Sequence, residues 1–197
     1  MNITRCFEPF EHIIVDDVYT KDELSKIWRE IYFLKDKFKA PHETMTATKD
    51  GAELKSNASL LIDSVYTDRA FSDILQINRK AFSGEILGAI SQLHPAYGIA
   101  KICNTDGTLI NYYADGDYYQ AHSDGAIFTF ITFLLQDKQE FSGGDFLFPD
   151  FDYTITQRNN RLIVFSGCIR HQVTEIKLNT PDSEGRFSMT QFLNLRG

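Results

Sequence analysis

The chain changes character near Tyr97, and this change restricts its possible folds more than any other feature. Beyond Tyr97, short runs rich in Ile, Phe, Tyr and Thr alternate with turn-forming pairs such as Asp115-Gly116 and Asn159-Asn160. Aromatic and β-branched residues favour extended chain, whereas Asp, Asn and Gly favour turns. About seven or eight strands fit this spacing, which predicts a double-stranded β-helix, a compact jelly-roll or cupin-like core, over about residues 97–197.

The preceding part, about residues 1–96, is expected to be mainly helical. Thr20 and Glu23 have the spacing of a capping box, and apolar residues then recur at helical intervals: Leu24, Ile27, Trp28 and Ile31. Between Lys39 and Asn57 the chain is polar and predicts a surface loop bordering a site.

A second helical region is predicted from near Thr67 toward His94, where Pro95 ends it. Its expected buried face consists of Phe71, Ile74, Leu75, Ile77, Phe82, Ile86, Leu87 and Ile90. The predicted fold class is therefore mainly β with flanking helices, the N-terminal helices supporting the β core. With 197 residues and no repeat or linker, one domain over 1–197 is expected.

The net charge and the cysteines limit which partners, cross-links and cellular compartment we expect for this protein. The formal net charge of -7 and the absence of a basic run argue against a nucleic-acid or anionic-membrane partner. Cys6, Cys103 and Cys168 are too few and too far apart for a disulfide framework or a zinc knuckle. No apolar stretch has the length of a signal peptide or a membrane span. These features favour a cytoplasmic protein.

His122 and Asp124 are two residues apart, so on extended chain both side chains project to the same side. His171 follows an apolar run over residues 161–167 that could pair beside them. Two imidazoles and one carboxylate leave three adjacent positions of an octahedral ion open, which suits ferrous iron, whereas a structural zinc site takes four ligands. The alternative is a chance pair in a turn and a core histidine.

The last strand offers a candidate anion site. Strict alternation places Arg186, Ser188 and Thr190 on one face, and the opposite face carries Phe187, Met189 and Leu193. A guanidinium inside a barrel requires an anion, and its planar fork can bind a carboxylate with two parallel hydrogen bonds, Ser188 donating a third.

Two alternatives to this anion site stay open. Arg186 at the surface would pair with Asp182 or Glu184. Lys177, six residues after His171, is a rival anchor.

The segment Tyr113-Ala-Asp-Gly116-Asp-Tyr118-Tyr119-Gln-Ala-His122-Ser-Asp124 resembles the metal-binding motif of the 2-oxoglutarate and Fe(II) oxygenases, in the branch that contains prolyl 4-hydroxylase catalytic domains. The likeness continues in order through a Thr-bearing strand at 128–135, Ser142-Gly143-Gly144-Asp145, the distal His171-Gln172-Val173 and Gly185-Arg186, and it spans about Phe10 to Leu195.

The resemblance implies roles for individual residues. His122, Asp124 and His171 would bind Fe(II), Arg186 would bind the distal carboxylate of 2-oxoglutarate, and Tyr113 would border the pocket. Tyr119 and Thr129 are interpreted as packing residues.

The sequence departs from the family pattern at three positions. Arg186 lies fifteen residues after His171, farther than is usual; Asp145 stands where Glu is common; and Phe146 replaces a small hydroxyl residue.

The implied activity is that of a dioxygenase using Fe(II), 2-oxoglutarate and O2, with succinate and CO2 as co-products and ascorbate as a reductant. A prolyl-4-hydroxylase type of hydroxylation is expected, on a peptidyl, free amino-acid or other small-molecule substrate. One alternative is a nucleic-acid dealkylase, but Gln191 and Phe192 stand where a second arginine would be expected. The other is a non-catalytic, metal-binding β-barrel interaction module.

Overall fold

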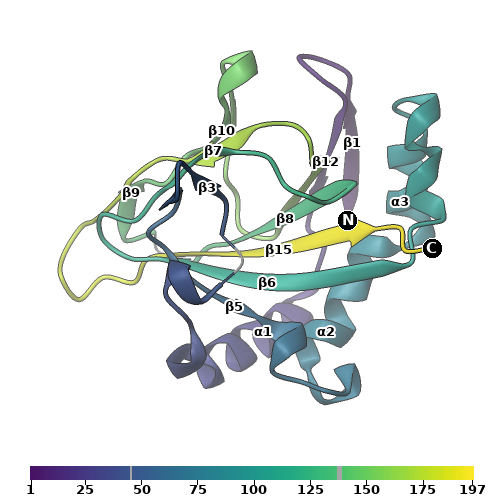
Figure 1. The fold of residues 1–197 in the computed structure, drawn as a ribbon. Helices are drawn as coiled ribbons and strands as arrows, with labels where there is room; N and C mark the ends of the chain where they lie inside the picture. Colours follow the sequence, from purple (N-terminus) through teal and green to yellow (C-terminus); the bar gives the residue numbers. More distant parts are fainter. Residues whose placement is uncertain (45, 137–138) are drawn as a thin grey trace.

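The computed structural model describes residues 1–44, 46–136 and 139–197. Its main element is a seven-stranded antiparallel sheet in the order β1-β2-β12-β8-β15-β6-β5 (Figure 1). The strands of this sheet are β1 (Asn2–Cys6), β2 (His12–Asp16), β5 (Ala58–Leu61), β6 (Thr105–Tyr113), β8 (Phe128–Leu134), β12 (Arg161–Ser166) and β15 (Arg186–Asn194).

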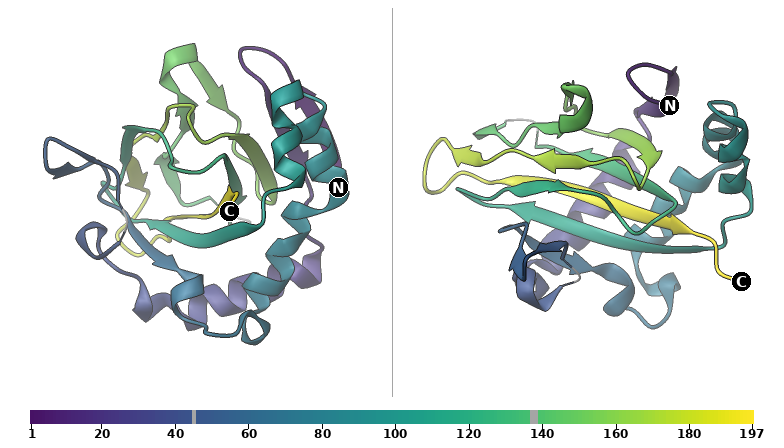
Figure 2. Two further views of the ribbon diagram at one scale, coloured as in Figure 1. Left: turned by 45° about the vertical axis from the view of Figure 1, so that its right-hand side comes forward. Right: turned by 45° about the horizontal axis from the view of Figure 1, so that its top comes forward.

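A smaller sheet in the order β11-β10-β13-β7 lies opposite the inner face of the main sheet (Figure 2). Its strands are β7 (Tyr119–His122), β10 (Phe146–Phe148), β11 (Tyr153–Ile155) and β13 (His171–Val173), and the pair β9 (Phe141–Gly143) and β14 (Ile176–Leu178) extends beside it. Buried aromatic side chains, including Phe133, Phe146, Phe148 and Phe165, fill the space between the sheets. This arrangement confirms the predicted fold class.

Helices cover the outer face of the main sheet (Figure 2): α1 (Lys21–Phe33), α2 (Asp73–Ile77) and α3 (Gly84–Ser91). The capping box that begins α1 is present as predicted, because the Thr20 hydroxyl accepts from the Glu23 amide at 3.2 Å and the Thr20 amide donates to the Glu23 carboxylate at 2.6 Å. Trp28 packs edge-on against Phe187 of β15, with ring centroids 5.4 Å apart.

The second predicted helical region is interrupted. Ser72 and Ser83 each accept a hydrogen bond from the amide three residues later, and each therefore begins a new short helix. Phe71, predicted to be buried, is 78% exposed. Pro95 does not end α3, which stops at Ser91; it begins a 3-10 turn.

Other predictions about the helices and strands were only partly right. The first third of the chain was expected to be mainly helical, yet β1, β2 and β5 belong to the main sheet, because β2 pairs with the distant β12 and β5 with β6. The expected loop at 39–57 borders a large cavity, as predicted, because Lys39, Glu43 and Lys55 line it, but it also contains the hairpin of β3 (Thr48–Lys49) and β4 (Ala52–Glu53). Ten strands, β6 to β15, occupy the described residues after Tyr97, more than the seven or eight expected. Among the described residues, no helix combines the length and apolar composition that crossing a bilayer needs.

Candidate active site

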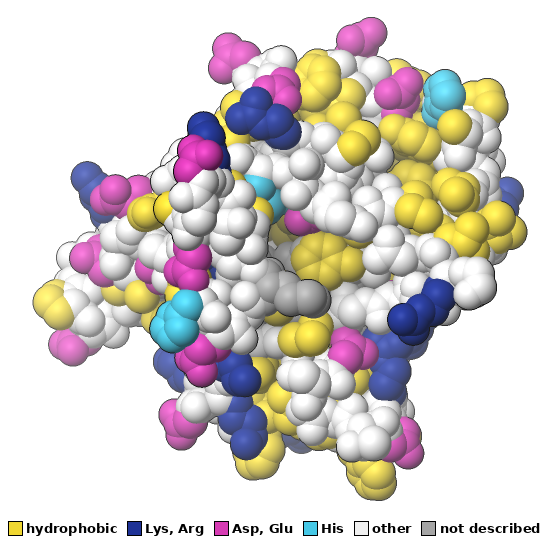
Figure 3. Space-filling view, in the orientation of Figure 1, with side chains coloured by type: hydrophobic (Ala, Val, Ile, Leu, Met, Phe, Trp, Pro, Cys, Tyr) yellow, Lys and Arg dark blue, Asp and Glu magenta, His cyan; other side chains and the backbone are white. Residues whose placement is uncertain are grey.

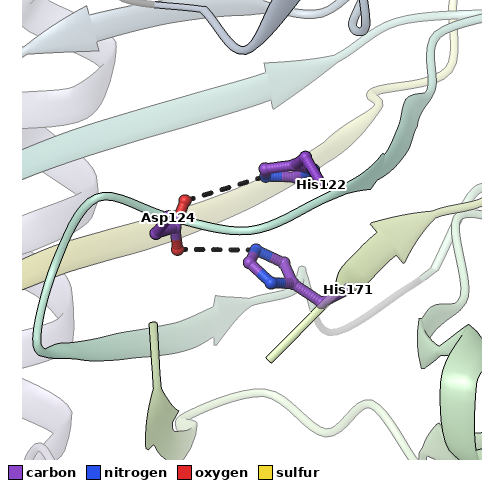
Figure 4. A group of neighbouring side chains, drawn as sticks. All are labelled: His122, Asp124 and His171. Carbon is purple, nitrogen blue, oxygen red and sulfur yellow. Dashed lines mark ion pairs between the residues drawn. The ribbon is translucent and has the colours of Figure 1, made fainter. Parts of the chain in front are cut away.

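His122, Asp124 and His171 meet where the smaller sheet ends (Figure 4). His122 is the last residue of β7 and lies directly opposite His171, the first residue of β13, in the antiparallel register. Asp124 follows β7, and its amide donates to the Gly167 carbonyl at 2.8 Å, which holds the chain in place just beyond the strand. Strand pairing thus positions both histidines, and a loop hydrogen bond positions the backbone of Asp124.

The three side chains point toward one another. Nε2 of His122 lies 3.8 Å from Oδ1 of Asp124, and Nε2 of His171 lies 3.5 Å from Oδ2. One potential ligand atom from each residue falls within 4.8 Å of the others. The predicted convergence is confirmed, and a chance pair in a turn does not describe this geometry.

The donor atoms suit a divalent metal. Nδ1 of His122 donates to the Gln120 carbonyl at 2.8 Å and Nδ1 of His171 to the Ile169 carbonyl at 3.0 Å, which leaves both Nε2 lone pairs free. Burial lowers the pKa of His171 to about 4; burial, and then the nearby His171, lower the pKa of His122 to about 4. Both imidazoles are therefore neutral near pH 7, as metal ligands must be.

Asp124 experiences opposing effects. Burial raises the pKa of its carboxyl group, while the Thr129 hydroxyl, which donates to Oδ2 at 2.5 Å, opposes that rise. A carboxylate in this position is stabilised by a cation between it and the imidazoles. The residues therefore fit an ion held by two nitrogens and one oxygen.

Two residues that were interpreted as packing residues touch this cluster. Thr129 holds Asp124 as described, and the Tyr119 ring stacks on His122 with centroids 3.6 Å apart and an angle of 11° between the rings. The Tyr119 hydroxyl accepts from the Ala47 amide at 3.3 Å. The parity of Thr129 with Ile131 and Phe133, which line the inner core, is the sequence signal that would have placed it inside.

Arg186 is buried, with 1% of its surface exposed. Its Nε donates to Oε1 of Gln157 at 2.6 Å, but Nη1 and Nη2 have no hydrogen-bond partner. The guanidinium carbon lies 5.1 Å from the centre of the Tyr113 ring and 5.5 Å from that of Phe133. Burial lowers the pKa of Arg186, yet an arginine stays charged in proteins. The arrangement is a cation with two donors available to a ligand.

The surface alternative for Arg186 is wrong. Glu184 instead accepts from the Tyr32 hydroxyl at 2.7 Å and lies 3.6 Å from Nζ of Lys35. Lys177 is exposed on β14, opposite Ser142, and does not line the cavity.

The double glycine gives Arg186 its space. Gly143 and Gly144 both have φ of +69°. A Cβ on Gly143 would lie 2.1 Å from the Glu175 carbonyl oxygen, and one on Gly144 would lie 2.9 Å from the Ile176 side chain and 3.3 Å from Cδ of Arg186. Only glycine adopts this backbone while allowing such close approach.

One cavity of about 1180 Å³ contains both the triad and Arg186. Tyr113, Ser188 and Thr190 also line it, so the predicted polar face of β15 points inward, while Phe187 and Met189 lie in the core beneath the helices. The molecular face in Figure 3 is hollowed, and its acidic and basic side chains are interspersed.

Residues 108–194, which include the triad and Arg186, match the model of the 2OG-Fe(II) oxygenase superfamily. The part of the chain that carries the triad is thus assigned to this superfamily. It has the facial triad of a 2OG-Fe(II) dioxygenase, formed by His122, Asp124 and His171. No curated protein sequence matches it significantly.

Several solved structures with the same fold are prolyl hydroxylases. The oxygenase resembles a Pseudomonas putida prolyl-4-hydroxylase (TM-score 0.67, 17% identity, 94% of this chain and 93% of that one). It also resembles a viral collagen prolyl hydroxylase from Paramecium Bursaria Chlorella virus-1, solved with 2OG (TM-score 0.60, 13% identity, 94% of this chain and 96% of that one). A third similar structure is a Trichoplax adhaerens prolyl hydroxylase in complex with a hypoxia inducible factor peptide fragment (TM-score 0.66, 12% identity, 93% of this chain and 83% of that one). At these identities the likeness establishes the fold.

Proposed function

We propose that this oxygenase hydroxylates an amino-acid or peptidyl substrate of prolyl-4-hydroxylase type, with His122, Asp124 and His171 holding Fe(II) and Arg186 binding 2-oxoglutarate. The observation that carries the proposal is that one cavity contains the triad and a buried guanidinium with two unpartnered nitrogens. The guanidinium does not stabilise the fold by itself, because a buried unpartnered cation costs free energy.

The triad residues would supply a neutral, preorganised ligand set. Backbone carbonyls orient both imidazoles, and Thr129 and the Gly167 carbonyl hold Asp124 in place. When bound, ferrous iron with 2-oxoglutarate activates O2 for oxidation of a C–H bond and releases succinate and CO2. Three protein ligands would leave coordination positions open for these reactants.

Arg186 would bind the distal carboxylate of 2-oxoglutarate through Nη1 and Nη2, with the Ser188 hydroxyl, which also lines the cavity, as a further donor. The Gln157 amide oxygen fixes the plane of the guanidinium from the other side. Tyr113 and Phe133 flank the guanidinium and exclude water from it, which strengthens a charge-assisted bond.

The proposed substrate class rests on likeness and on space. Several neighbours of the same fold are prolyl hydroxylases, and one of them holds a peptide fragment. The cavity of about 1180 Å³ has room for a residue of a peptide or for a free amino acid beside the co-substrate. Ascorbate is proposed as the reductant that keeps the iron ferrous, and residues 1–197 as one catalytic domain.

The test is release of succinate from 2-oxoglutarate by purified protein, with and without Fe(II). We expect Fe(II)-dependent turnover that Asp124→Ala abolishes, with loss of metal affinity measured by calorimetry. Asp150→Ala removes an exposed carboxylate that pairs with Arg170 and is the matched control. Metal binding without succinate release would favour the non-catalytic interaction module, and full turnover in Asp124→Ala would refute the triad assignment.

A further inference from the structure

Lys55 is held beside the triad by backbone hydrogen bonds on both sides. The Gln120 amide donates to the Leu54 carbonyl at 2.7 Å, and the Ser56 amide donates to the Tyr118 carbonyl at 3.1 Å. These bonds place Lys55 opposite Tyr119, in an isolated β-bridge, three residues before His122. The position of Lys55 is therefore set by β7, the strand that carries the first metal ligand.

The side chain of Lys55 is buried in the active-site cavity. Only 4% of the residue is exposed, and it is one of the residues that line the cavity. Nζ donates to the Ser59 hydroxyl at 2.9 Å and lies 5.7 Å from the centre of the Tyr119 ring, which stacks on His122. An ammonium group has three N–H donors, so Ser59 satisfies one of them.

No carboxylate among the described residues forms an ion pair with Lys55. Besides Asp124, three acidic residues line the same cavity: Asp63 and Asp106 are both paired with Arg69, and Glu43 accepts a hydrogen bond from the Ala40 amide at 3.4 Å. Burial lowers the pKa of Lys55 to about 8, while the Glu53 carboxylate opposes this shift, so the amine is still largely protonated at pH 7. The charge of Glu53 thus reaches Lys55 only at a distance, and the buried ammonium has no carboxylate in ion-pair contact among the described residues.

Charge balance in the cavity points to an anion. Under the proposed function, a divalent ion and the Arg186 guanidinium together balance the Asp124 carboxylate and the two carboxylates of 2-oxoglutarate. Lys39 and Glu43, which also line the cavity, carry opposite charges and cancel in this count, so the charge of Lys55 is left over. A buried charge without a partner is costly, and one further negative charge from a bound molecule would remove that cost.

We propose that Lys55 binds a carboxylate of the primary substrate, so that this oxygenase acts on a carboxylate-bearing molecule rather than on a neutral peptide segment. The carboxylate belongs either to a free amino acid or to an acidic side chain beside the target residue in a peptide. Lys55 is then a specificity-determining residue, distinct from the 2-oxoglutarate anchor. The inference rests on the proposed function.

The experiment compares acids with their uncharged counterparts. L-proline is paired with L-prolinamide, and the capped peptide N-acetyl-Pro-Glu-amide with N-acetyl-Pro-Gln-amide. Binding is measured by calorimetry, on the protein alone and anaerobically with Fe(II) and 2-oxoglutarate, and turnover by succinate release. In the wild-type protein we expect at least one acid to bind about 10- to 100-fold more tightly than its amide, the range of a charge-assisted hydrogen bond.

The variants assign that preference to Lys55. Lys55→Met should abolish it, Lys55→Arg should retain part of it, and both should leave the KM for 2-oxoglutarate in uncoupled turnover unchanged. Lys49→Met removes an exposed charge from β3 of the neighbouring hairpin and should preserve the preference.

Several outcomes would overturn the inference. In the wild-type protein, amides binding as tightly as both acids would do so even if Lys55→Met failed to fold. A rise in the KM for 2-oxoglutarate in Lys55→Met would make Lys55 a co-substrate anchor instead. Absence of Fe(II)-dependent succinate release would refute the proposed function alone, because binding of acid and amide to the protein would still be compared.

Discussion

Two buried charged residues in different regions of the molecule differ in how far the protein satisfies their hydrogen bonds. Glu30 of α1 is 8% exposed, and its two carboxylate oxygens accept hydrogen bonds at 2.7 Å from the Ser72 hydroxyl and the Ile74 amide. Arg186 in the cavity is 1% exposed, and two of its three guanidinium nitrogens have no partner. Glu30 is satisfied by the fold, whereas Arg186 is left for a ligand.

This difference separates charges that stabilise from charges that bind. Glu30 joins α1 to the start of α2, so its removal would leave buried donors unsatisfied. Arg186 contributes little to the stability of the fold because its burial is only partly compensated. Variants at buried charges should therefore divide into those that change folding and those that change binding.

The largest effect is expected for Glu30→Ala. Loss of both hydrogen bonds should lower the free energy of unfolding by about 3 kcal/mol, since each unsatisfied buried donor costs roughly 1 to 3 kcal/mol. Urea denaturation measures the change, with Glu85→Ala, an exposed first-turn glutamate of α3, as the control. A higher KM for 2-oxoglutarate in the folded variant would contradict the distinction between Glu30 as a stabilising charge and Arg186 as a binding charge.

The triad histidines predict a pH dependence. The pKa of His171 is about 4 in the folded protein, below its ordinary value near 6.5, so the unfolded chain binds more protons between these pH values. Stability of the metal-free protein should therefore fall from pH 6.5 toward pH 4, by about 2 to 3 kcal/mol for this residue at 1.36 kcal/mol per pKa unit.

Denaturation of His171→Gln across this range, beside the exposed control His42→Gln, measures the contribution. A slope that stays as steep in His171→Gln would show that other groups cause the loss.

Arg186→Met should change ligand binding and leave stability intact, whereas Glu30→Ala should lower stability. The KM for 2-oxoglutarate should rise by about 10- to 100-fold, corresponding to roughly 1.5 to 3 kcal/mol for a charged hydrogen-bonding group, while the unfolding free energy stays equal or increases. Lys177→Met, which removes an exposed lysine of β14, should change neither quantity. A KM that rises only in Lys177→Met would transfer the anchor to that residue.

The smallest effect is expected for Thr129→Val. Thr129 is an uncharged residue that supports a binding residue, so its variant lies between those that change folding and those that change binding. It removes the hydrogen bond to Asp124 without altering the size of the side chain, and should weaken metal binding by about 1 kcal/mol, or roughly fivefold. Calorimetric metal titration measures this, with Thr108→Val on β6 as a buried control outside the triad. Unchanged metal affinity would show that Thr129 only packs.

Several of the predictions that held have a local physical cause, whereas the convergence of His171 with His122 required the pairing of β13 with β7. The capping box at Thr20 and Glu23 needs only neighbouring residues, and so does the alternation that turns Arg186 and Ser188 inward from β15. The interruption of the second helical region at Ser72 also has a local cap, but its apolar residues at helical spacing obscured that signal.

The sequence by itself determined which residues have the chemistry of a metal centre and an anion site, because alternation and ligand type are properties of short segments. Only the tertiary structure decided that β1, β2 and β5 join the main sheet, that Thr129 and Tyr119 support the triad, and that Lys55 lies in the cavity. Thr129 and Tyr119 contact triad residues only five and three positions away, but the sheet membership of β1, β2 and β5 and the location of Lys55 depend on pairing between strands that are distant in the sequence. Such pairing is set by the packing of the whole core, and no local pattern of residues encodes it.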